Sequence, residues 1–425
     1  MTMELRRRYS LLLNTLDVLV VFLACVLVNV NSFIRFRQFS EVENFSTNEL
    51  DYIFFGTVTV ILIVFLLWKR QLLPIYFEAW KNNKLLIAFM AYALISALWT
   101  VYLPATLNKL FFLFFSTIVG SYIAVRYGRR GTIDVLTWIG SICSVLSIFI
   151  VLFFPFVGVM QNEPFVGSWT GMFWHRNHTG NIFAFFNIIF LFRLLLDDKS
   201  TWRSKAVFTF FYILSALIVF GSHSATGIIV FLFLHFVVGL VVIWLKVHQR
   251  IKRWHYYASV ALLLAGFVVF ITHADFFFGL LGRSSNLTGR VPLWLDLFQN
   301  YYLQKPVFGF GFGALWMLKS FRILIQIRHN WPYQVYFADN GFFDILLNTG
   351  LVGLLLFMFS YLSYGVRSFR QAIRNKSWLY FFPLLTFLYI LIGNLTYSFL
   401  LEVDQFVWMI LIVMIFITTE PKQAS

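Results

Sequence analysis

Long apolar stretches separated by short polar connectors dominate the hydrophobic pattern of this chain. Most of these stretches approach roughly 20 residues, which is enough for an α-helix to cross the hydrocarbon core of a bilayer. A transmembrane β-barrel would instead show short segments of alternating polarity. The pattern therefore predicts an all-α polytopic integral membrane protein.

About twelve membrane-spanning helices can be placed on this pattern, and no stretch between them is typical of a separate soluble domain. We therefore expect residues 1–425 to form a single integral membrane domain. The expected spans are 11–30, 52–68, 85–102, 107–125, 133–153, 181–196, 206–220, 228–245, 256–272, 342–364, 378–392 and 406–417.

Basic residues in the connectors predict the orientation of these spans. Arg6, Arg7 and Arg8 precede the first span, and every connector expected to be cytoplasmic is basic. Because cytoplasmic loops of membrane proteins are enriched in Lys and Arg, both termini are expected in the cytoplasm. No small-residue cleavage site follows the first apolar run, so we interpret it as a retained span rather than a signal peptide.

The interval 273–340 is the one long connector, and this orientation places it on the outer face. It carries six basic residues, Arg283, Arg290, Lys305, Lys319, Arg322 and Arg328, against three acids, Asp275, Asp296 and Asp339. Lys and Arg are normally scarce on the outer face, so an anionic ligand is the expected reason for them. We expect an outer-loop subdomain here.

A short amphipathic helix is predicted inside this outer loop, close to residue 290. Pro292 suits a first helical turn. Four side chains then recur on one face at helical spacing, namely Trp294, Leu297, Phe298 and Tyr301. Such a helix lies on the membrane or covers the spans.

Composition and charge narrow the class further. The 425 residues are 60% hydrophobic and 12% charged, which leaves too little polar surface for a soluble protein. The net charge of +15 suggests nucleic acid, but most basic residues flank spans, so no nucleic-acid partner is expected. Cys25 and Cys143 both fall inside spans, which argues against a disulfide or a metal site. No P-loop is present, and no cofactor is expected.

Two polar stretches lie at the ends of predicted spans. Residues 171–180 place His175, Arg176 and Asn177 at the outer mouth of a span. Such groups are costly near hydrocarbon unless they face a wet cavity or a partner, although they could instead anchor the helix at the interface. Residues 222–227 are more typical of a helix cap or close helix packing, and no serine-nucleophile elbow surrounds them.

Three further features belong to the outer loop. Arg290 precedes the predicted short helix, where free backbone N–H groups favour an anion such as phosphate; the alternative is an arginine paired with a nearby carboxylate. Asp339 precedes the span 342–364 and could be its N-cap instead of a functional group. The glycines of 306–313 have the wrong spacing for a dinucleotide site and are expected to permit a tight turn or a close backbone approach.

These stretches, in this order, resemble the O-antigen ligase and polymerase family of bacterial membrane glycosyltransferases, with the exopolysaccharide-polymerase branch nearest. The motifs that carry the resemblance are LWTVYLPATL at 98–107, GMFWHRNHTG, GSHSATG, TGRVPLW, KPVFGFGFGALW and ADNGFFDILLNTGLVGLLLF. The resemblance implies undecaprenyl-diphosphate-linked glycan donors, a large outer loop and no metal.

The resemblance also implies roles for individual residues. Arg176 and Arg290 match the outer-face arginines that hold the diphosphate in the ligases. Where the ligases have a His-Asn pair before a late span, this chain has Asp339-Asn340, and His329-Asn330 lies ten residues earlier. Asp339 is favoured as the catalytic base because of its position, and His329 is the alternative because imidazole suits proton transfer near neutral pH. The expected substrate-binding residues are His175, Asn177, Asn340 and Trp294.

The resulting hypothesis is an inverting, metal-independent polymerase of lipid-linked glycan repeats in the inner membrane of a bacterium. Its expected partners are the lipid-linked donor, the glycan acceptor and the bilayer, with a flippase and a chain-length regulator as further candidates. One alternative is a ligase that transfers finished glycan to lipid A core, protein or wall polymer. Alternatives of other classes are a transporter or flippase and a structural subunit of an export complex, although no interrupted spans in matching halves support a transporter.

Overall fold

The computed structural model describes residues 18–21, 24, 49–161, 165–173, 175–196, 201–247, 290–331, 334–400 and 406–419. Most of the predicted first span and all of the predicted span 256–272 lie outside these residues, as do 273–289 of the outer loop. The described chain is almost entirely helical, and its one β-bridge joins Val159 to Trp169.

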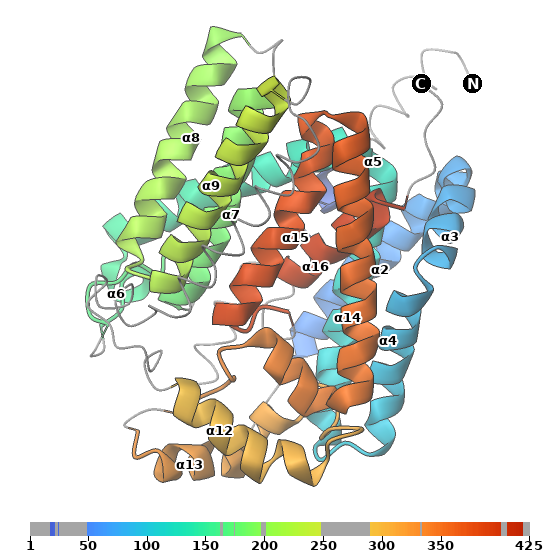
Figure 1. Ribbon diagram of the computed structural model, residues 1–425, viewed down its shortest axis with the longest axis vertical. Helices are drawn as coiled ribbons and strands as arrows, with labels where there is room; N and C mark the ends of the chain where they lie inside the picture. Colours follow the sequence, from blue (N-terminus) through green and yellow to red (C-terminus); the bar gives the residue numbers. More distant parts are fainter. Residues whose placement is uncertain are drawn as a thin grey trace.

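The helices pack as one bundle (Figure 1). Helices α7–α9 form one side, α2–α4 the other, and α14–α16 lie between them, while α12 and α13 lie across the lower end. In chain order the elements are α2 (Glu49–Trp68), η1 (Arg70–Leu72), α3 (Leu73–Lys81), α4 (Lys84–Ile95), η2 (Ser96–Leu98), α5 (Leu103–Phe153), α6 (Pro155–Gly158), α7 (Arg176–Leu196), α8 (Trp202–Gly221), α9 (Ala225–Val247), α12 (Arg290–Asn300), η4 (Tyr302–Gln304), η5 (Leu315–Met317), α13 (Lys319–Arg328), α14 (Gly341–Asn375), α15 (Trp378–Thr396) and α16 (Phe406–Ile417).

Six of the described helices are long and apolar enough to cross a membrane, namely α5, α7, α8, α9, α14 and α15. The pair α2 and α3, bent by 90°, could form a seventh span. Two predicted spans, 107–125 and 133–153, are joined in α5, where Gly128 at φ 57° breaks the helical geometry. The prediction of an all-α membrane protein is confirmed, whereas the total of twelve spans stays a prediction.

Helix α16 differs from an ordinary span. It has 12 residues, about 18 Å of helix, which is shorter than the ~30 Å hydrocarbon core. All of its residues are buried. A Cβ on Gly120 of α5 would lie 2.7 Å from the carbonyl oxygen of Met409, so glycine is what allows α5 to approach α16 this closely. The boundaries predicted for this segment are correct, but it is a short inner helix.

The glycine-rich segment 306–313 packs against a break in α14 at Gly350, where φ is 65°. The amides of Phe310 and Gly311 donate to the carbonyl oxygens of Leu347 (3.1 Å) and Asn348 (2.9 Å). The amide of Leu351 donates to Pro306 O at 2.9 Å. The inserted segment therefore satisfies backbone groups that the break leaves without helical partners. The prediction that these glycines permit a close backbone approach is confirmed.

The α12–α13 region has an apolar cluster of its own. It contains Leu293, Leu297, Phe310, Leu315, Trp316, Phe321, Ile325, Ala338 and Leu347. The helix predicted near residue 290 is present as α12, but the predicted buried face is wrong in part. Leu293 and Leu297 are the most buried, whereas Phe298 is 42% exposed and stacks on Tyr302. Helix α13 was not predicted.

The two ends of the bundle differ in character. The end that carries α12 and α13, which we name the site end, also holds residues 165–173, 175, 221–224 and 397–400. At the opposite end, Arg129 donates to Gln371 Oε1 (2.6 Å) and to Ile417 O (2.8 Å), and Arg193 pairs with Asp134 at 2.6 Å. We name this end, which carries Arg129 and Arg193, the basic end.

Gly350→Ala should destabilise the protein. Its φ lies in the left-handed region, which costs an L-residue about 1–2 kcal/mol, and the new Cβ would lie 2.2 Å from Val307 O. We expect a lower melting temperature for the detergent-solubilised protein. Gly239→Ala in α9 is the matched control, because nothing lies within 4 Å of its added Cβ and alanine suits a helix interior better. Equal melting temperatures for the two variants would contradict this account of the break.

The topology prediction can be tested with single cysteines at the two ends, in a chain whose Cys25 and Cys143 are replaced by alanine. Ser320 in α13 and Asn375 at the end of α14 are both exposed. Because the basic end is expected in the cytoplasm, a membrane-impermeant maleimide should label Ser320→Cys in intact cells and Asn375→Cys only after lysis. Labelling with the opposite preference would invert the assignment of the two faces.

Candidate functional site

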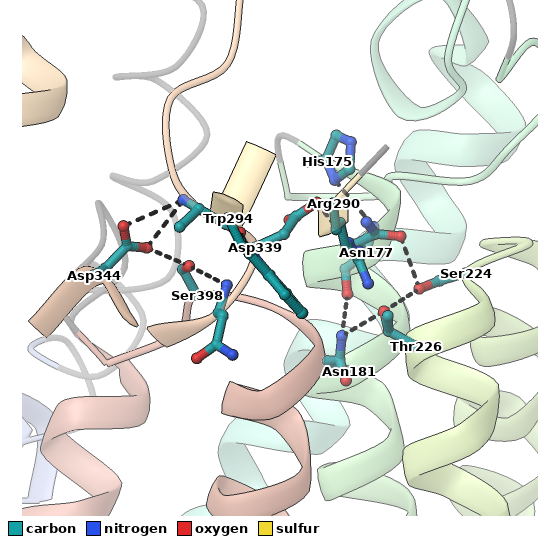
Figure 2. Close-up of polar contacts among 12 residues, drawn as sticks. His175, Asn177, Asn181, Ser224, Thr226, Arg290, Trp294, Asp339, Asp344 and Ser398 are labelled. Atoms are coloured by element: carbon teal, nitrogen blue, oxygen red, sulfur yellow. Dashed lines mark hydrogen bonds and ion pairs between the residues drawn. The ribbon is translucent and has the colours of Figure 1, made fainter. Parts of the chain in front are cut away.

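A buried carboxylate joins three segments at the start of α14 (Figure 2). Asp344 is 4% exposed. Trp316 Nε1 donates to its Oδ1 at 2.6 Å, the amide of Ala338 lies 3.2 Å from both carboxylate oxygens, and Ser398 Oγ donates to Oδ2. Because a buried charge is costly unless it is hydrogen-bonded, these contacts fix η5, the turn before α14 and the segment after α15 relative to one another.

Asn340 caps α14. Its Oδ1 accepts from the amides of Phe342 and Phe343, both at 3.1 Å, and its own amide donates to Ser398 Oγ at 3.0 Å. The alternative that Asp339 is the N-cap is therefore wrong. The Asn340 side chain, which we expected to bind substrate, is engaged in capping.

Asp339 and Arg290 form an ion pair beside this cap. Arg290 Nε lies 2.9 Å from Asp339 Oδ2, and Trp294 Nε1 donates to Ala338 O at 2.6 Å, so α12 is held against the turn at two points. Asp339 has φ 53°. Its Oδ1 is buried and receives no hydrogen bond from the described residues. The alternative of an arginine paired with a carboxylate is thus confirmed for Arg290.

This ion pair occupies only one edge of the guanidinium. Nε is bonded, whereas no described residue forms a hydrogen bond with either of the two terminal nitrogens of Arg290. The side chains of Arg290 and Asp339 are 13% and 25% exposed. Arg290 therefore has a fixed orientation and a terminal fork that can donate two hydrogen bonds to an anion.

Arg176 is held by the start of α7 and the turn after α8. It is 4% exposed, its Nη1 donates to His223 O at 2.6 Å, and its guanidinium lies 3.9 Å from the centroid of the Phe165 ring. His223 adopts φ 49° in this turn. The charge of Arg176 is thus fixed inside the protein, beneath the site end.

Asn177 belongs to a polar network between α7 and α9. Ser224 Oγ donates to Asn177 Oδ1 at 3.0 Å and lies 3.0 Å from Thr226 Oγ1, which accepts from Asn181 Nδ2 at 3.1 Å (Figure 2). Ser224 Oγ also accepts from the amide of Gly227, so it caps α9. The prediction of a helix cap and close packing at 222–227 is confirmed.

His175 lies between the two predicted diphosphate arginines. Its ring is parallel to that of Tyr397, with 4° between planes and 6.4 Å between centroids. Burial lowers the pKa of His175 to about 3, with further lowering by the charges of Arg176, His178 and Arg290. Its Nδ1 accepts from the amide of Asn177 at 3.2 Å, which places the proton of the neutral ring on Nε2. The fold therefore brings Arg176 and Arg290 close enough for both to act on one imidazole.

His329 lies in a separate cluster. Its Nε2 is 3.0 Å from Asp296 Oδ2, and its ring stacks on Trp331 with centroids 4.7 Å apart. Asp296 is 7% exposed, and its Oδ1 accepts from Arg328 and from Asn300 Nδ2 at 2.7 Å. The two expected candidates for the base thus differ in partner, because Asp339 is paired with an arginine and His329 with a carboxylate.

Sequence analysis missed Tyr397, Ser398 and Asp296. The first two follow α15, and their role depends on contacts with Asp344 and His175, which are distant in the sequence. Asp296 had a usable signal, since it lies between Leu293 and Leu297 on the buried side of α12. An acid on an apolar helix face needs a partner, and the partners here come from α13.

The sequence of this chain is similar to those of known proteins. A family model described as O-antigen ligase matches residues 210–358, a range that includes Arg290, His329 and Asp339 but not Arg176. These matches support an O-antigen ligase/polymerase-like family. The chain is also 26% identical over 322 residues to the exopolysaccharide production protein ExoQ of Rhizobium meliloti (strain 1021), covering 71% of this chain and 69% of ExoQ.

Members of an O-antigen ligase/polymerase-like family carry out glycan transfer, and the site end has groups suited to binding an anionic donor. Among the described residues, no group of three or more His, Cys, Asp or Glu side chains could hold a metal ion. The charged side chains at this end also include Arg322 of α13, which is 7% exposed and donates from Nη1 to Trp316 O at 3.3 Å.

His175 should not titrate between about pH 5 and pH 8, because its pKa is lowered to about 3. NMR of protein labelled with ¹⁵N-histidine should show one neutral ring with its proton on Nε2, assigned by its loss in His175→Gln. Since an unfolded histidine has a pKa near 6.5, this residue should lower the stability of the fold as pH falls below that value. A His175 signal that titrates near pH 6.5 would refute this environment.

Proposed function

We propose that this protein polymerises undecaprenyl-diphosphate-linked oligosaccharide repeat units into exopolysaccharide, capsule or O-antigen on the outer face of the bacterial inner membrane. The observation that carries the proposal is Arg290, which Asp339 fixes through Nε and whose two terminal nitrogens bond no described residue, close to neutral His175. The family match and the relative named for exopolysaccharide production support this class of reaction.

The reaction is an inverting displacement at the sugar carbon that bears the diphosphate. The acceptor hydroxyl oxygen forms the new bond to that carbon, and the bond from carbon to phosphate oxygen breaks. The undecaprenyl diphosphate leaves with the electron pair, and the hydroxyl proton passes to a base. Arg290 stabilises the charge that grows on the leaving diphosphate.

Arg176 acts mainly through its charge. Its Nη1 is bound to His223 O and its side chain is buried, so it adds positive potential under the diphosphate from a fixed position. Trp294 is half-buried with its indole N–H bound to Ala338 O, which leaves the ring edge to contact a sugar. Asn177 and Asn340 shape the site through the α7–α9 network and the α14 cap.

The contacts favour His329 over Asp339 as the base, which reverses the preference drawn from the sequence. One oxygen of Asp339 is paired with Arg290 and the other is buried, so neither is available to accept a proton from an acceptor hydroxyl. A base must come within hydrogen-bond reach of the proton it removes. Asp339 therefore positions Arg290, and His329 is the proton acceptor.

Transfer of finished glycan to lipid A core, protein or wall polymer is the second candidate function, and the family described as O-antigen ligase is the observation that favours it. Incubation of the purified protein with lipid-linked repeats alone separates the two. A polymerase yields a ladder of lengthening products, whereas a ligase needs a different acceptor. Neither outcome requires the flippase or chain-length regulator that we expect as partners in the cell.

Arg290→Ala should lower polymer formation by ~100-fold or more, since loss of one donor to a developing oxyanion costs roughly 3 kcal/mol. Arg290→Lys should recover only part, because lysine lacks the planar fork. The measurement is the rate of ladder formation from lipid-linked repeats at matched protein levels.

Lys305→Ala is the control for Arg290→Ala, because it removes the same charge from an exposed position in the same outer region. Asp339→Asn should also reduce the rate, and its effect should vanish in the Arg290→Ala background if it acts through Arg290. A wild-type rate of ladder formation in Arg290→Ala would contradict the proposal that Arg290 binds the diphosphate.

A further inference from the structure

Asp296 binds three other side chains at the site end, and the chemistry described above does not use it. It lies on α12, is 7% exposed, and divides its two oxygens between different partners. Oδ1 accepts from Arg328 and Asn300, whereas Oδ2 faces His329 Nε2 at 3.0 Å. Arg328 already links α13 to α12 through Oδ1 of Asp296. The bond from Oδ2 to the His329 imidazole is not needed for that link, so it indicates another role for this carboxylate.

The geometry at His329 is that of an oriented imidazole. A carboxylate at Nε2 holds the ring proton on that nitrogen, which leaves Nδ1 as the acceptor. No described residue forms a hydrogen bond with Nδ1, and this atom is not among the fully buried unpartnered nitrogens, so it retains access to solvent. Trp331 covers one face of the ring, with 22° between planes, and restricts its rotation.

Helix α12 connects this pair to the donor site. Arg290 and Asp296 are six residues apart, about 9 Å along the helix axis, and Trp294 between them is bonded to Ala338 O beside Asp339. One rigid element therefore sets the spacing between the diphosphate clamp and the imidazole. An acceptor sugar that lies along α12 would reach both Arg290 and His329.

We propose that Asp296 is a positioning residue that holds His329 with Nδ1 directed at the acceptor hydroxyl, an inference that rests on the proposed glycosyl transfer. Nδ1 takes the hydroxyl proton as the oxygen attacks the sugar carbon and the lipid diphosphate departs. The imidazolium that forms is stabilised by the Asp296 carboxylate, which itself stays ionised. The proton is then released to solvent from Nδ1 before the next turnover.

The test is a double-mutant cycle on the full-length protein, with lipid-linked repeats as the donor. His329→Gln should lower kcat by about 100-fold, and Asp296→Asn by at least about 10-fold, with the KM for the donor unchanged because the diphosphate clamp is intact. If Asp296 acts through His329, adding Asp296→Asn to His329→Gln should cause no further loss. A full additional loss in that background, or wild-type kcat in Asp296→Asn, would overturn the proposal.

Arg328→Gln is the matched control. It removes the other ionic partner of the same carboxylate at a side chain that is 43% exposed, where an ion pair contributes little, so kcat should stay within about 3-fold of wild type. A loss as large as that of Asp296→Asn would indicate that Asp296 only anchors α13, which contradicts the proposal.

A second measurement does not depend on activity. In wild-type protein labelled with ¹⁵N-histidine, the neutral ring of His329 should carry its proton on Nε2, with its signal assigned by loss in His329→Gln. A neutral ring with its proton on Nδ1 would overturn the inference. Absence of any polymer from wild-type protein while this tautomer is observed would count against the proposed function instead.

Discussion

The buried carboxylate of Asp344 is the contact on which the arrangement of the site depends. A charge this far from water must be compensated by hydrogen bonds, and the donors come from η5, from the turn before α14 and from the segment after α15. Each segment is therefore fixed in place by the same requirement. The cap at Asn340 shares Ser398 with Asp344, so the start of α14 and the return of the chain after α15 form one unit.

Three arginines of the site end are held in place by different kinds of contact. Arg290 is held by a carboxylate through one nitrogen, Arg176 by a backbone carbonyl and an aromatic ring, and Arg328 by Asp296. Arg290 has a fixed orientation, and no described residue bonds its two terminal nitrogens. This difference, and not the number of positive charges, is the reason to propose Arg290 as the group that binds the diphosphate.

Helix α12 connects the two groups to which we assign roles toward the donor and the acceptor. Its first residue carries the guanidinium, its middle is bonded to the turn before α14 through Trp294, and its buried acid faces His329. A short helix is stiff over this distance, so the spacing between the groups is set by its backbone. The apolar cluster around Leu293 and Leu297 in turn holds α12 in place. We therefore expect activity to depend on the apolar packing around α12 as well as on the polar groups.

The sequence alone determined the helical membrane class, the approximate positions of most of the described long helices, the short helix at 290–300 and the close approach of the 306–313 glycines, because apolar period and backbone sterics are local properties. It also singled out Arg290, His175 and His329. Only the tertiary structure decided what each one faces: Asp339 is the partner of Arg290, and Asp296, to which the sequence assigned no role, is the partner of His329. Side-chain pairs between residues 33 and 49 positions apart depend on how helices dock, and no local pattern encodes that choice. For the same reason, the contacts of Tyr397 with His175 and of Ser398 with Asp344 could not be predicted, because they depend on where α15 ends in the fold.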